Sequence, residues 1–428
     1  MSDRQSELFR LIESVLGCAN VTQSPPLNID GLAPSVLAFP GSAHEVVECL
    51  RICSSLSAAV IPAGSMSWLE CGNPIRFADV VLSLKRMTRV IDYSPPDLTA
   101  TVEAGLTLNA FNELTRRERQ WLPLDPPGAF AASLGAIAAC NSSGALRLGF
   151  GTPRDYVIGL KLAHADGNES KCGGRVVKNV AGYDMNKLYV GSFGTLAVIT
   201  ELTFKLRPLE ERDVTLVVSA RSEASLLDFA KRVLASELQP GSVFLTKRLV
   251  DDLIGSSEEE DALLIRFIDN EAAVNHQVDW VKRATDHDLE LKLTVLTDDQ
   301  GEPIWVRVAD LDRRAANAAR ISVPVSTVES VLAKLAPAGC AAAVDLGLGI
   351  IRVAFEEGER KTADAIKRWR FDVAVAGGSL FVERASSAVR QEVDAWGDAG
   401  PVSSLMKTIK AKFDPESILN PGRFVAGI

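Results

Sequence analysis

The chain lacks the cysteine spacing of a metal site or a disulfide framework. It has 428 residues and seven cysteines, an odd number, and no two of them form a C-x-x-C pair. This pattern argues against a zinc ribbon, an iron–sulfur cluster and a disulfide-stapled fold. We therefore expect reduced thiols, most of them buried.

Basic residues are not in excess. The formal net charge is −9, so the sequence offers no basic field that would attract nucleic acid. An anionic small molecule would need a local arginine. Arg116, Arg117 and Arg119 follow a helical pattern, and we interpret them as a solvated helix end rather than as a ligand site.

Long apolar segments are absent as well. The longest weakly polar run, residues 130–140, is too short and too rich in alanine and glycine to cross a bilayer. The first five residues are not followed by the apolar region of an export signal. We therefore expect a soluble, cytoplasmic protein that has no transmembrane segment and associates with a membrane only through partners.

The chain has few histidines and no nicotinamide-dinucleotide signature. No G-x-G-x-x-G motif opens a strand–helix–strand unit, which argues against a classical nicotinamide domain. Of the four histidines, His44 lies in a predicted capping turn, His164 lies at an apolar strand, and His276 and His287 stand eleven positions apart. This spacing does not indicate a metal site, and we expect none.

What the chain does contain is a set of segments rich in small residues. Residues 62–68 follow an apolar strand pattern and contain one glycine and two serines. The backbone N–H groups of such a turn can hold phosphate without cationic side chains. Residues 133–144 are typical either of a tightly packed alanine-rich helix or of a site where a flat aromatic ring or a phosphate approaches the main chain.

A third segment, residues 191–195, combines Gly191 and Gly194 with two hydroxyl residues, so the backbone turns there. It leads into residues 196–206, which are rich in β-forming residues and alternate late in the run. This pattern predicts a buried strand that becomes amphipathic. Such a turn indicates either an ordinary hairpin corner or a close approach to a ligand.

The block from Gly173 to Pro208, which begins with GGRVVKNVAGYD, resembles a block of flavoproteins of the vanillyl-alcohol oxidase (PCMH) type. Within that family it is most similar to the FAD-binding subunits of bacterial glycolate oxidases. The resemblance covers residues 35–208 and 400–424 and is weaker over 210–390. It implies a PCMH-type FAD-binding domain with two subdomains, and FAD as the cofactor.

The resemblance also implies the residues that bind FAD. Residues 62–68 resemble the family's pyrophosphate loop, although Ala63, Met66 and Trp68 depart from its usual pattern, and Ala136 stands where relatives have a second glycine. The cofactor-binding residues implied by position are Pro62, Ala63, Gly64, Ser65, Met66, Ser67, Trp68, Pro126, Pro127, Ser133, Leu134, Gly135, Ala138, Asn141, Ser142, Gly144, Gly194, Val198, Ile199 and Asn420.

The same resemblance bears on how FAD is attached. Some relatives bind the flavin covalently through a histidine of the pyrophosphate loop, and residues 62–68 contain no histidine. Non-covalent FAD is therefore implied.

Catalytic residues are harder to identify. Oxidation of a 2-hydroxy acid needs a base for the hydroxyl proton and a cation for the carboxylate. Arg352 and Arg384 lie on predicted strands, where they could face a flavin or bond neighbouring carboxylates. His164, Tyr183 and Asp184 are equally explained by local structure, so the general base stays unknown.

The family's catalytic subunits carry a metal cluster rich in histidine and acidic residues. His276 and His287 do not reproduce it, which makes the resemblance to the accessory FAD subunit the better one.

We expect an α+β fold in which an α+β cap domain follows the FAD-binding domain. A small strand–helix–strand unit is predicted over residues 36–61, with a capping box at 42–45, and the C-terminal segment is expected to return to the FAD domain. The expected domains are 1–30 (helix and connector), 31–208 (FAD-binding), 209–395 (cap) and 396–428 (C-terminal segment). Within the cap we expect strands at 214–218, 262–267, 350–355 and 379–382, and helices near 222–236, 271–287, 326–336 and 360–370.

Three functions stay open at this level. The chain is an FAD subunit of a glycolate oxidase complex that works with a catalytic FAD subunit and an iron–sulfur subunit on a small 2-hydroxy acid. Alternatively, it is a structural subunit with a vestigial flavin pocket, or a self-sufficient 2-hydroxy-acid dehydrogenase.

Overall fold

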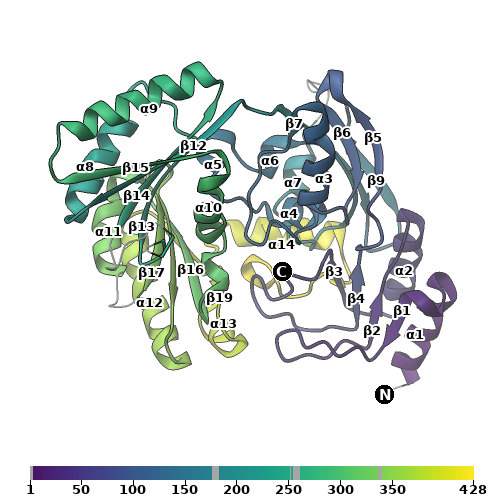
Figure 1. The fold of residues 1–428 in the computed structure, drawn as a ribbon. Helices are drawn as coiled ribbons and strands as arrows, with labels where there is room; N and C mark the ends of the chain where they lie inside the picture. Colours follow the sequence, from purple (N-terminus) through teal and green to yellow (C-terminus); the bar gives the residue numbers. More distant parts are fainter. Residues whose placement is uncertain (1–2, 176–182, 251, 254–260, 336–339) are drawn as a thin grey trace. The chain divides into compact units, whose positions relative to one another are not determined.

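The chain folds into two compact units (Figure 1). The computed structural model describes residues 3–175, 183–250, 252–253, 261–335 and 340–428. The first unit comprises Met1–Ser142, Thr152–Pro208 and Asp398–Ile428, and the second comprises Ser143–Gly151 and Leu209–Gly397. The short segment Ser143–Gly151 thus belongs to the second unit, although it lies inside the range that the sequence assigns to FAD binding. Residues 176–182 of the family block lie outside the described residues.

The first unit begins with a small α/β layer. Its four-stranded sheet has the order β1-β2-β4-β3, in which β2 and β3 run parallel to β4, while β1 pairs antiparallel with β2. Two helices belong to this layer, and the Ser42 hydroxyl caps the second by accepting from the Glu45 backbone N–H at 3.2 Å. The elements are α1 (Asp3–Leu16), β1 (Val21–Gln23), β2 (Val36–Ala38), α2 (Ala43–Ser55), β3 (Val60–Ala63) and β4 (Val80–Ser83).

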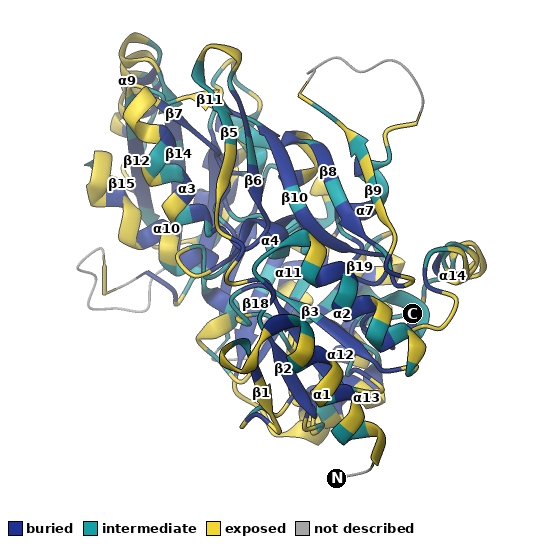
Figure 2. Ribbon diagram, turned by 90° about the vertical axis from the view of Figure 1, so that its right-hand side faces the viewer, coloured by how far each residue is buried: buried dark blue, intermediate teal, exposed yellow. Residues whose placement is uncertain are grey.

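A five-stranded antiparallel sheet forms the second layer of this unit, in the order β5-β6-β10-β8-β9. Its three central strands are mostly buried, whereas the edge strands β5 and β9 contain only exposed and half-buried residues (Figure 2). The predicted strand at 196–206 is the central strand β10. The strands are β5 (Val90–Ser94), β6 (Thr99–Glu103), β8 (Val157–Ala163), β9 (Glu169–Gly173) and β10 (Val198–Lys205).

Short elements connect these strands. A two-stranded ribbon pairs β7 with β11, and the predicted arginine trio follows helix α3 in a 3₁₀ turn whose arginines are exposed. The elements are α3 (Leu108–Thr115), β7 (Gln120–Trp121), α4 (Leu134–Cys140), α6 (Pro153–Tyr156), α7 (Asn186–Tyr189) and β11 (Arg207–Pro208).

The second unit is built on an eight-stranded antiparallel sheet in the order β15-β12-β14-β13-β17-β18-β16-β19. The four predicted cap strands are β12, β14, β18 and β19, and the other four were not predicted. The strands are β12 (Arg212–Ala220), β13 (Ser242–Lys247), β14 (Ala262–Asp269), β15 (Leu291–Thr297), β16 (Asn317–Ser322), β17 (Ala341–Asp345), β18 (Ile350–Phe355) and β19 (Ser379–Arg384).

Both faces of this sheet are packed, as the alternation of strand residues requires. One face of the sheet forms a core with the four predicted helices. Strand residues Val218, Leu263 and Phe267 belong to this core, as does the fully buried Trp369 of one of the helices. On the other face, Val217 and Leu264 pack with Trp305 of a further helix. The helices are α5 (Arg147–Phe150), α8 (Glu223–Leu234), α9 (Glu271–Asp286), α10 (Glu302–Ala309), α11 (Val328–Leu335), α12 (Glu359–Val375) and α13 (Ser387–Val393).

The C-terminal segment returns to the first unit, as expected. After helix α14 (Val402–Phe413), the chain runs beside β3: the Val60 N–H donates to the Ile418 carbonyl at 2.7 Å, and the Asn420 N–H donates to the Val60 carbonyl at 2.9 Å. A region more than 350 residues away in sequence thereby adds a short parallel bridge to the small sheet.

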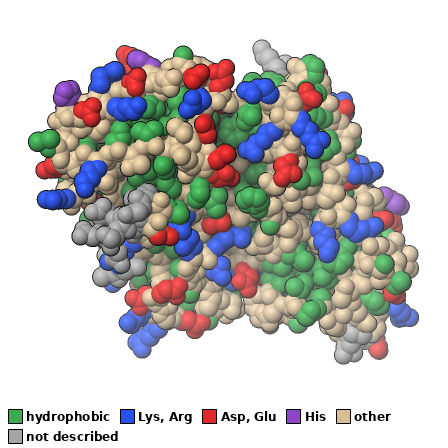
Figure 3. Space-filling model, in the orientation of Figure 1, with side chains coloured by type: hydrophobic (Ala, Val, Ile, Leu, Met, Phe, Trp, Pro, Cys, Tyr) green, Lys and Arg blue, Asp and Glu red, His purple; other side chains and the backbone are tan. Residues whose placement is uncertain are grey.

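The surface matches the composition. Lys, Arg, Asp and Glu side chains are interspersed on the face drawn in Figure 3. Within the described ranges, no helix has both the length and the apolar character needed to cross a membrane.

Candidate FAD-binding site

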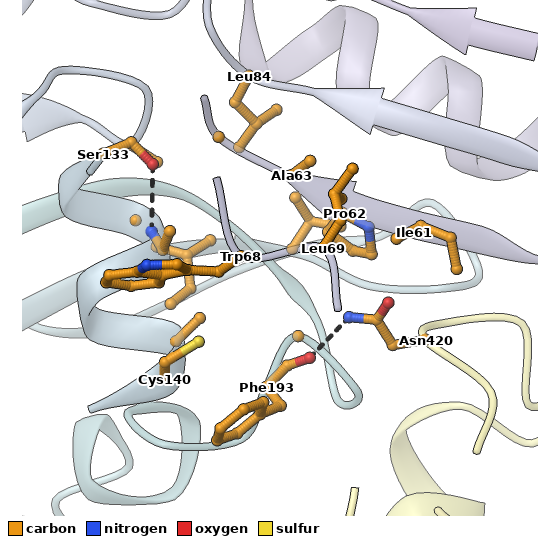
Figure 4. A pocket seen from close by; sticks show the side chains of 18 of the residues that line it. Ile61, Pro62, Ala63, Trp68, Leu69, Leu84, Ser133, Cys140, Phe193 and Asn420 are labelled. Carbon is orange, nitrogen blue, oxygen red and sulfur yellow. Dashed lines mark hydrogen bonds between the residues drawn. The ribbon is translucent and has the colours of Figure 1, made fainter. Parts of the chain in front are cut away.

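A pocket lies within the first unit where the three predicted small-residue segments meet (Figure 4). Its walls are the end of β3 with the following loop, one face of helix α4, the turn before β10 together with the start of that strand, and the C-terminal segment. Residues more than 200 positions apart thus line one cavity.

The loop after β3 approaches helix α4 very closely at Gly64. A Cβ atom at this position would lie 1.8 Å from the Ser133 hydroxyl oxygen, which no side chain could tolerate. The Gly64 carbonyl in turn accepts a 2.8 Å hydrogen bond from the buried Ser83 hydroxyl. Only glycine permits this approach, which positions residues 64–69 along the pocket.

Helix α4 presents a face of small residues to the pocket. Ser133 caps the helix, and its hydroxyl accepts from the Ala136 backbone N–H at 3.4 Å. A Cβ atom on Gly135 would lie 2.7 Å from the Ala104 Cβ at the end of β6. The segment is therefore both a tightly packed helix and a pocket wall, which joins the two interpretations left open by the sequence.

The turn before β10 forms the facing wall. Phe193 and Gly194 both have positive φ, at 56° and 64°, so the backbone turns sharply there. The Asn420 side chain donates from Nδ2 to the Phe193 carbonyl at 2.7 Å, and the Phe193 ring stacks on Phe424 with centroids 5.4 Å apart. The turn and the C-terminal segment thus form one continuous surface.

Arg423 anchors the loop that follows β3. Its guanidinium donates to the Asp30 carboxylate at 2.9 Å, to the Asn73 carbonyl at 2.7 Å and to the Leu69 carbonyl at 2.5 Å. The Arg423 and Asp30 side chains are almost completely buried. Arg423 therefore joins the C-terminal segment to the later part of the loop that follows β3, at residues 69–73.

The lining is chemically neutral apart from Arg423. Its other titratable groups are two thiols, on Cys71 and Cys140. Burial raises the pKa of the Cys140 thiol well above its ordinary value, and the nearby Cys71 raises it further. The thiol therefore stays protonated at neutral pH.

One buried oxygen atom of the lining, Asn420 Oδ1, has no hydrogen-bond donor among the described residues. Asn420 is 7% exposed, and its Oδ1 atom accepts no hydrogen bond from any described residue. Buried polar atoms are normally paired. FAD carries hydroxyl and N–H donors that would satisfy this oxygen, and the neutral, small-residue walls suit its flat ring system, so the residues present fit this cofactor.

Most of the implied cofactor-binding residues come together in this pocket. Those that line it are Pro62, Ala63, Gly64, Ser65, Met66, Ser67, Trp68, Ser133, Gly135, Gly194, Val198, Ile199 and Asn420. Residues that line it but were absent from the implied set are Ile61, Leu69, Cys71, Leu84, Ala104, Ala136, Ala139, Cys140, Phe193, Ala197 and Arg423. The spacing of Ala136, Ala139 and Cys140 on one helix face could have identified those three.

Seven implied residues do not line the pocket: Pro126, Pro127, Leu134, Ala138, Asn141, Ser142 and Gly144. Leu134 and Ala138 are fully buried in the core behind helix α4. Asn141 ends that helix with φ 47°, and its Oδ1 accepts from the Arg154 backbone N–H at 3.1 Å. Gly144 belongs to the second unit.

Two of the residues considered for catalysis, Arg352 and His164, are held by structural contacts of their own. The Arg352 guanidinium contacts Glu383 at 3.0 Å and Asp312 at 2.9 Å, and it also donates to two backbone carbonyls. This is the carboxylate pairing that the sequence left open. The His164 Nε2 atom lies 2.6 Å from the Ser170 hydroxyl, next to the strand that it follows. Tyr183 is exposed at the edge of the described residues.

Comparison with known proteins supports the cofactor. A family model for an FAD-binding domain matches residues 34–173. The chain is 26% identical over 422 residues to a mitochondrial D-lactate dehydrogenase [cytochrome] of Arabidopsis thaliana, covering 92% of this chain and 73% of that protein. It is also 26% identical over 429 residues to the glycolate oxidase subunit GlcD of Bacillus subtilis (strain 168), covering 92% and 89%. With the glycolate oxidase subunit GlcE of Escherichia coli (strain K12) it shares 33% identity over 178 residues, covering 41% and 49%.

The fold recurs in solved structures. An alkyldihydroxyacetonephosphate synthase superposes with a TM-score of 0.76 at 15% identity, covering 98% of this chain and 86% of that chain. This likeness extends over both units. Residues 34–173 thus match an FAD-binding domain, and the chain as a whole is similar to a D-lactate dehydrogenase and to a glycolate oxidase subunit.

Proposed function

We propose that the chain is the FAD-binding subunit of a glycolate-oxidase-type complex, through which electrons from glycolate or a related 2-hydroxy acid pass. The observation that carries the proposal is the pocket itself, in which separate segments of the chain converge on a cavity where Arg423 is the charged lining residue and Asn420 Oδ1 has no partner among the described residues. The similarity to two glycolate oxidase subunits supports the choice of complex.

The chain's own residues divide into two kinds of contact with FAD. The loop of residues 64–67 offers backbone N–H groups and the Ser65 and Ser67 hydroxyls, which lie 3.3 Å apart, to the anionic diphosphate. The faces of Ala136, Val198 and Ile199 offer apolar contact to the ring system. When bound, FAD supplies a two-electron acceptor.

We further propose that FAD is held without a covalent bond. Attachment needs a nucleophilic side chain. The described lining contains no histidine. Precipitating the protein with acid should therefore release all of the flavin into the supernatant, and flavin that stays in the pellet would contradict this point.

The partners that we propose are a catalytic FAD subunit and an iron–sulfur subunit, with the complex in the cytoplasm and any membrane contact made by its partners. Fractionation of cells that express a tagged chain tests the location. The domain boundaries that we propose for the chain are 31–208 for FAD binding, 209–395 for the cap and 396–428 for the returning segment.

An absorption spectrum of the purified chain is the first test. We expect a flavin spectrum, or an apoprotein that gains thermal stability when FAD is added, because a ligand that binds the folded state stabilises it. A colourless chain with no response to FAD would reject the proposal in favour of a structural subunit with a vestigial pocket.

Anaerobic addition of glycolate then separates the subunit from a complete enzyme. We expect glycolate to bleach the flavin in the assembled complex but not in the isolated chain. The alignment with a D-lactate dehydrogenase over 92% of this chain favours a second candidate, a self-sufficient 2-hydroxy-acid dehydrogenase. Bleaching of the isolated chain by D-lactate or glycolate would establish that candidate instead.

A further inference from the structure

Lys410 is a buried lysine whose ammonium group is fully engaged. It lies on helix α14 and is 5% exposed. Its Nζ atom donates to the Asp414 carboxylate at 2.5 Å, to the Thr195 carbonyl at 2.8 Å and to the Leu419 carbonyl at 2.9 Å. An ammonium has three donors, so every donor has an acceptor.

The two carbonyl acceptors belong to the two segments that meet at the pocket. Thr195 directly follows Gly194 in the turn before β10, and Leu419 directly precedes Asn420. These segments touch each other inside the pocket, where Asn420 Nδ2 donates to the Phe193 carbonyl at 2.7 Å. Lys410 therefore holds the two segments together from behind the wall that they form.

Asp414 completes this support. Its side chain is fully buried, and besides Lys410 it accepts from the backbone N–H groups of Ile418 at 3.0 Å and Leu419 at 2.8 Å. Removing charges from water is costly, and a buried ion pair often contributes little to net stability compared with apolar residues. Net stability alone is therefore a weak explanation for this pair. Two of the three acceptors of Lys410 are carbonyl groups of Thr195 and Leu419, which are adjacent in sequence to the lining residues Gly194 and Asn420.

We propose that Lys410 is a positioning residue for FAD: it fixes the Phe193–Asn420 wall, so that the unpaired Asn420 Oδ1 is directed at the cofactor. The inference rests on FAD binding in this pocket, as proposed above. Lys410 does not line the pocket, and it acts through Thr195 and Leu419.

Helix α14 has other contacts that keep it in place without Lys410. The Phe413 ring lies 6.0 Å from the His164 ring in a stacked arrangement and 5.8 Å from the Tyr189 ring in an edge-on arrangement. Ile409 also packs against the core. A variant that loses the ammonium should therefore still dock the helix, so its effect on the wall can be measured.

The experiment compares Lys410→Met, which keeps the aliphatic stem, with Lys412→Met, which removes an exposed lysine of the same helix. The apoproteins are titrated with FAD, and flavin fluorescence gives Kd, while visible circular dichroism reports the environment of the bound ring. We expect Kd to rise about tenfold or more in Lys410→Met, as when a supporting group behind a ligand is removed, with an altered circular dichroism signal. Lys412→Met should match the wild type.

A double variant, Lys410→Met with Asp414→Asn, separates positioning from folding. It removes the unpaired buried carboxylate that Lys410→Met leaves behind, so the apoprotein's melting temperature should recover toward that of the wild type. We expect FAD affinity to stay weak. Recovery of affinity together with stability, or a Kd within twofold of the wild type in both variants, would overturn the inference.

FAD binding by the wild type distinguishes failure of the proposed function from failure of the proposed role of Lys410. If it binds no FAD, the proposed function fails at that step. If it binds FAD and the Lys410 variants bind equally well, only the role of Lys410 fails.

Discussion

Arg423 and Asp30 form a buried ion pair, 2.9 Å between Nη1 and Oδ2, although 393 positions separate them in the sequence. The Asp30 carboxylate also accepts from the Ile75 backbone N–H at 3.2 Å. The pair therefore connects the N-terminal connector, the pocket loop and the C-terminal segment at one point. Residues 420 and 423 thus complete a pocket whose lining begins near residue 60.

Arg423→Met should destabilise the first unit strongly. It leaves the Asp30 carboxylate buried without its cation, and losing one partner of a buried pair costs about 3–5 kcal/mol. Urea unfolding of the apoprotein, followed by the fluorescence of Trp68 and the other tryptophans, measures the change. Arg10→Met, which removes an exposed arginine of the same unit, should change the free energy of unfolding by less than about 0.5 kcal/mol. A similar small change in Arg423→Met would contradict the anchoring role.

Gly64→Ala should impair FAD binding more than it impairs folding. The new methyl group would meet the Ser133 hydroxyl at 1.8 Å, so the loop must move away from helix α4. Overpacking of this kind costs about 1–3 kcal/mol. We expect the Kd for FAD, measured by fluorescence titration, to rise by more than about tenfold, since a shift of the loop displaces its N–H groups from the diphosphate.

Gly358→Ala is the matched control for that change. Gly358 lies in the second unit with a negative φ, and nothing lies within 4 Å of a Cβ atom built there. FAD affinity should be unchanged. Equal loss of affinity in both variants would show that Gly64 has no special place in the pocket.

Acid should destabilise the first unit partly through His164. Burial lowers the pKa of this imidazole below its ordinary 6.5, despite the nearby Asp166, which raises it. In the pH range between the lowered folded-state value and 6.5, the unfolded chain binds more protons than the folded one, so stability falls as pH falls through this window. Above pH 6.5 the effect vanishes.

Thermal unfolding from pH 7.5 to pH 5 tests this prediction against His164→Gln, which cannot titrate. The wild type should lose more stability than the variant over that range. Parallel curves would show that the imidazole is not involved, and a steeper curve for the variant would reverse the sign that we derive.

Arg352→Met should destabilise the second unit without weakening FAD binding. The guanidinium is held by Asp312 and Glu383. Its removal leaves the mostly buried Asp312 carboxylate without that cation and leaves Glu383 with Arg320 at 3.8 Å. Losing one partner of a buried pair costs about 3–5 kcal/mol. Calorimetry and FAD titration of the same sample measure the two effects. A stable variant that binds FAD normally but loses oxidation of a 2-hydroxy acid would instead assign Arg352 to the substrate.

Much of the secondary structure could be predicted from local sequence patterns. The capping serine at Ser42, the alternation in residues 196–206 and the four helical patterns of the cap each depend on neighbours a few positions away. Strands β13, β15, β16 and β17 were missed. Their patterns are short, and their pairing along the sheet depends on partners distant in sequence.

In the candidate site, too, some residues could be predicted from local sequence and others could not. Gly64 and Gly135 could be singled out because glycine is the residue that permits a tight turn or a very close packing contact. Leu134 and Ala138 lie in the same small-residue segment as Gly135, yet the direction of helix α4 turns them into the core. A linear segment does not tell which face of its helix meets the ligand.

From the order of its residues alone, the chain indicated its α+β character and the turns where backbone can come close to a ligand, because these follow from residue size and local periodicity. The cofactor class was implied by the resemblance of residues 173–208 to a known family. Tertiary structure alone decided that Arg423 and Lys410 contact the segments that line the pocket. Both are ordinary cations near the end of the chain until carbonyl groups at positions 69, 73 and 195 converge on them. Only the folded backbone brings those carbonyl groups together, and a buried cation needs hydrogen-bond acceptors to replace the water that it loses.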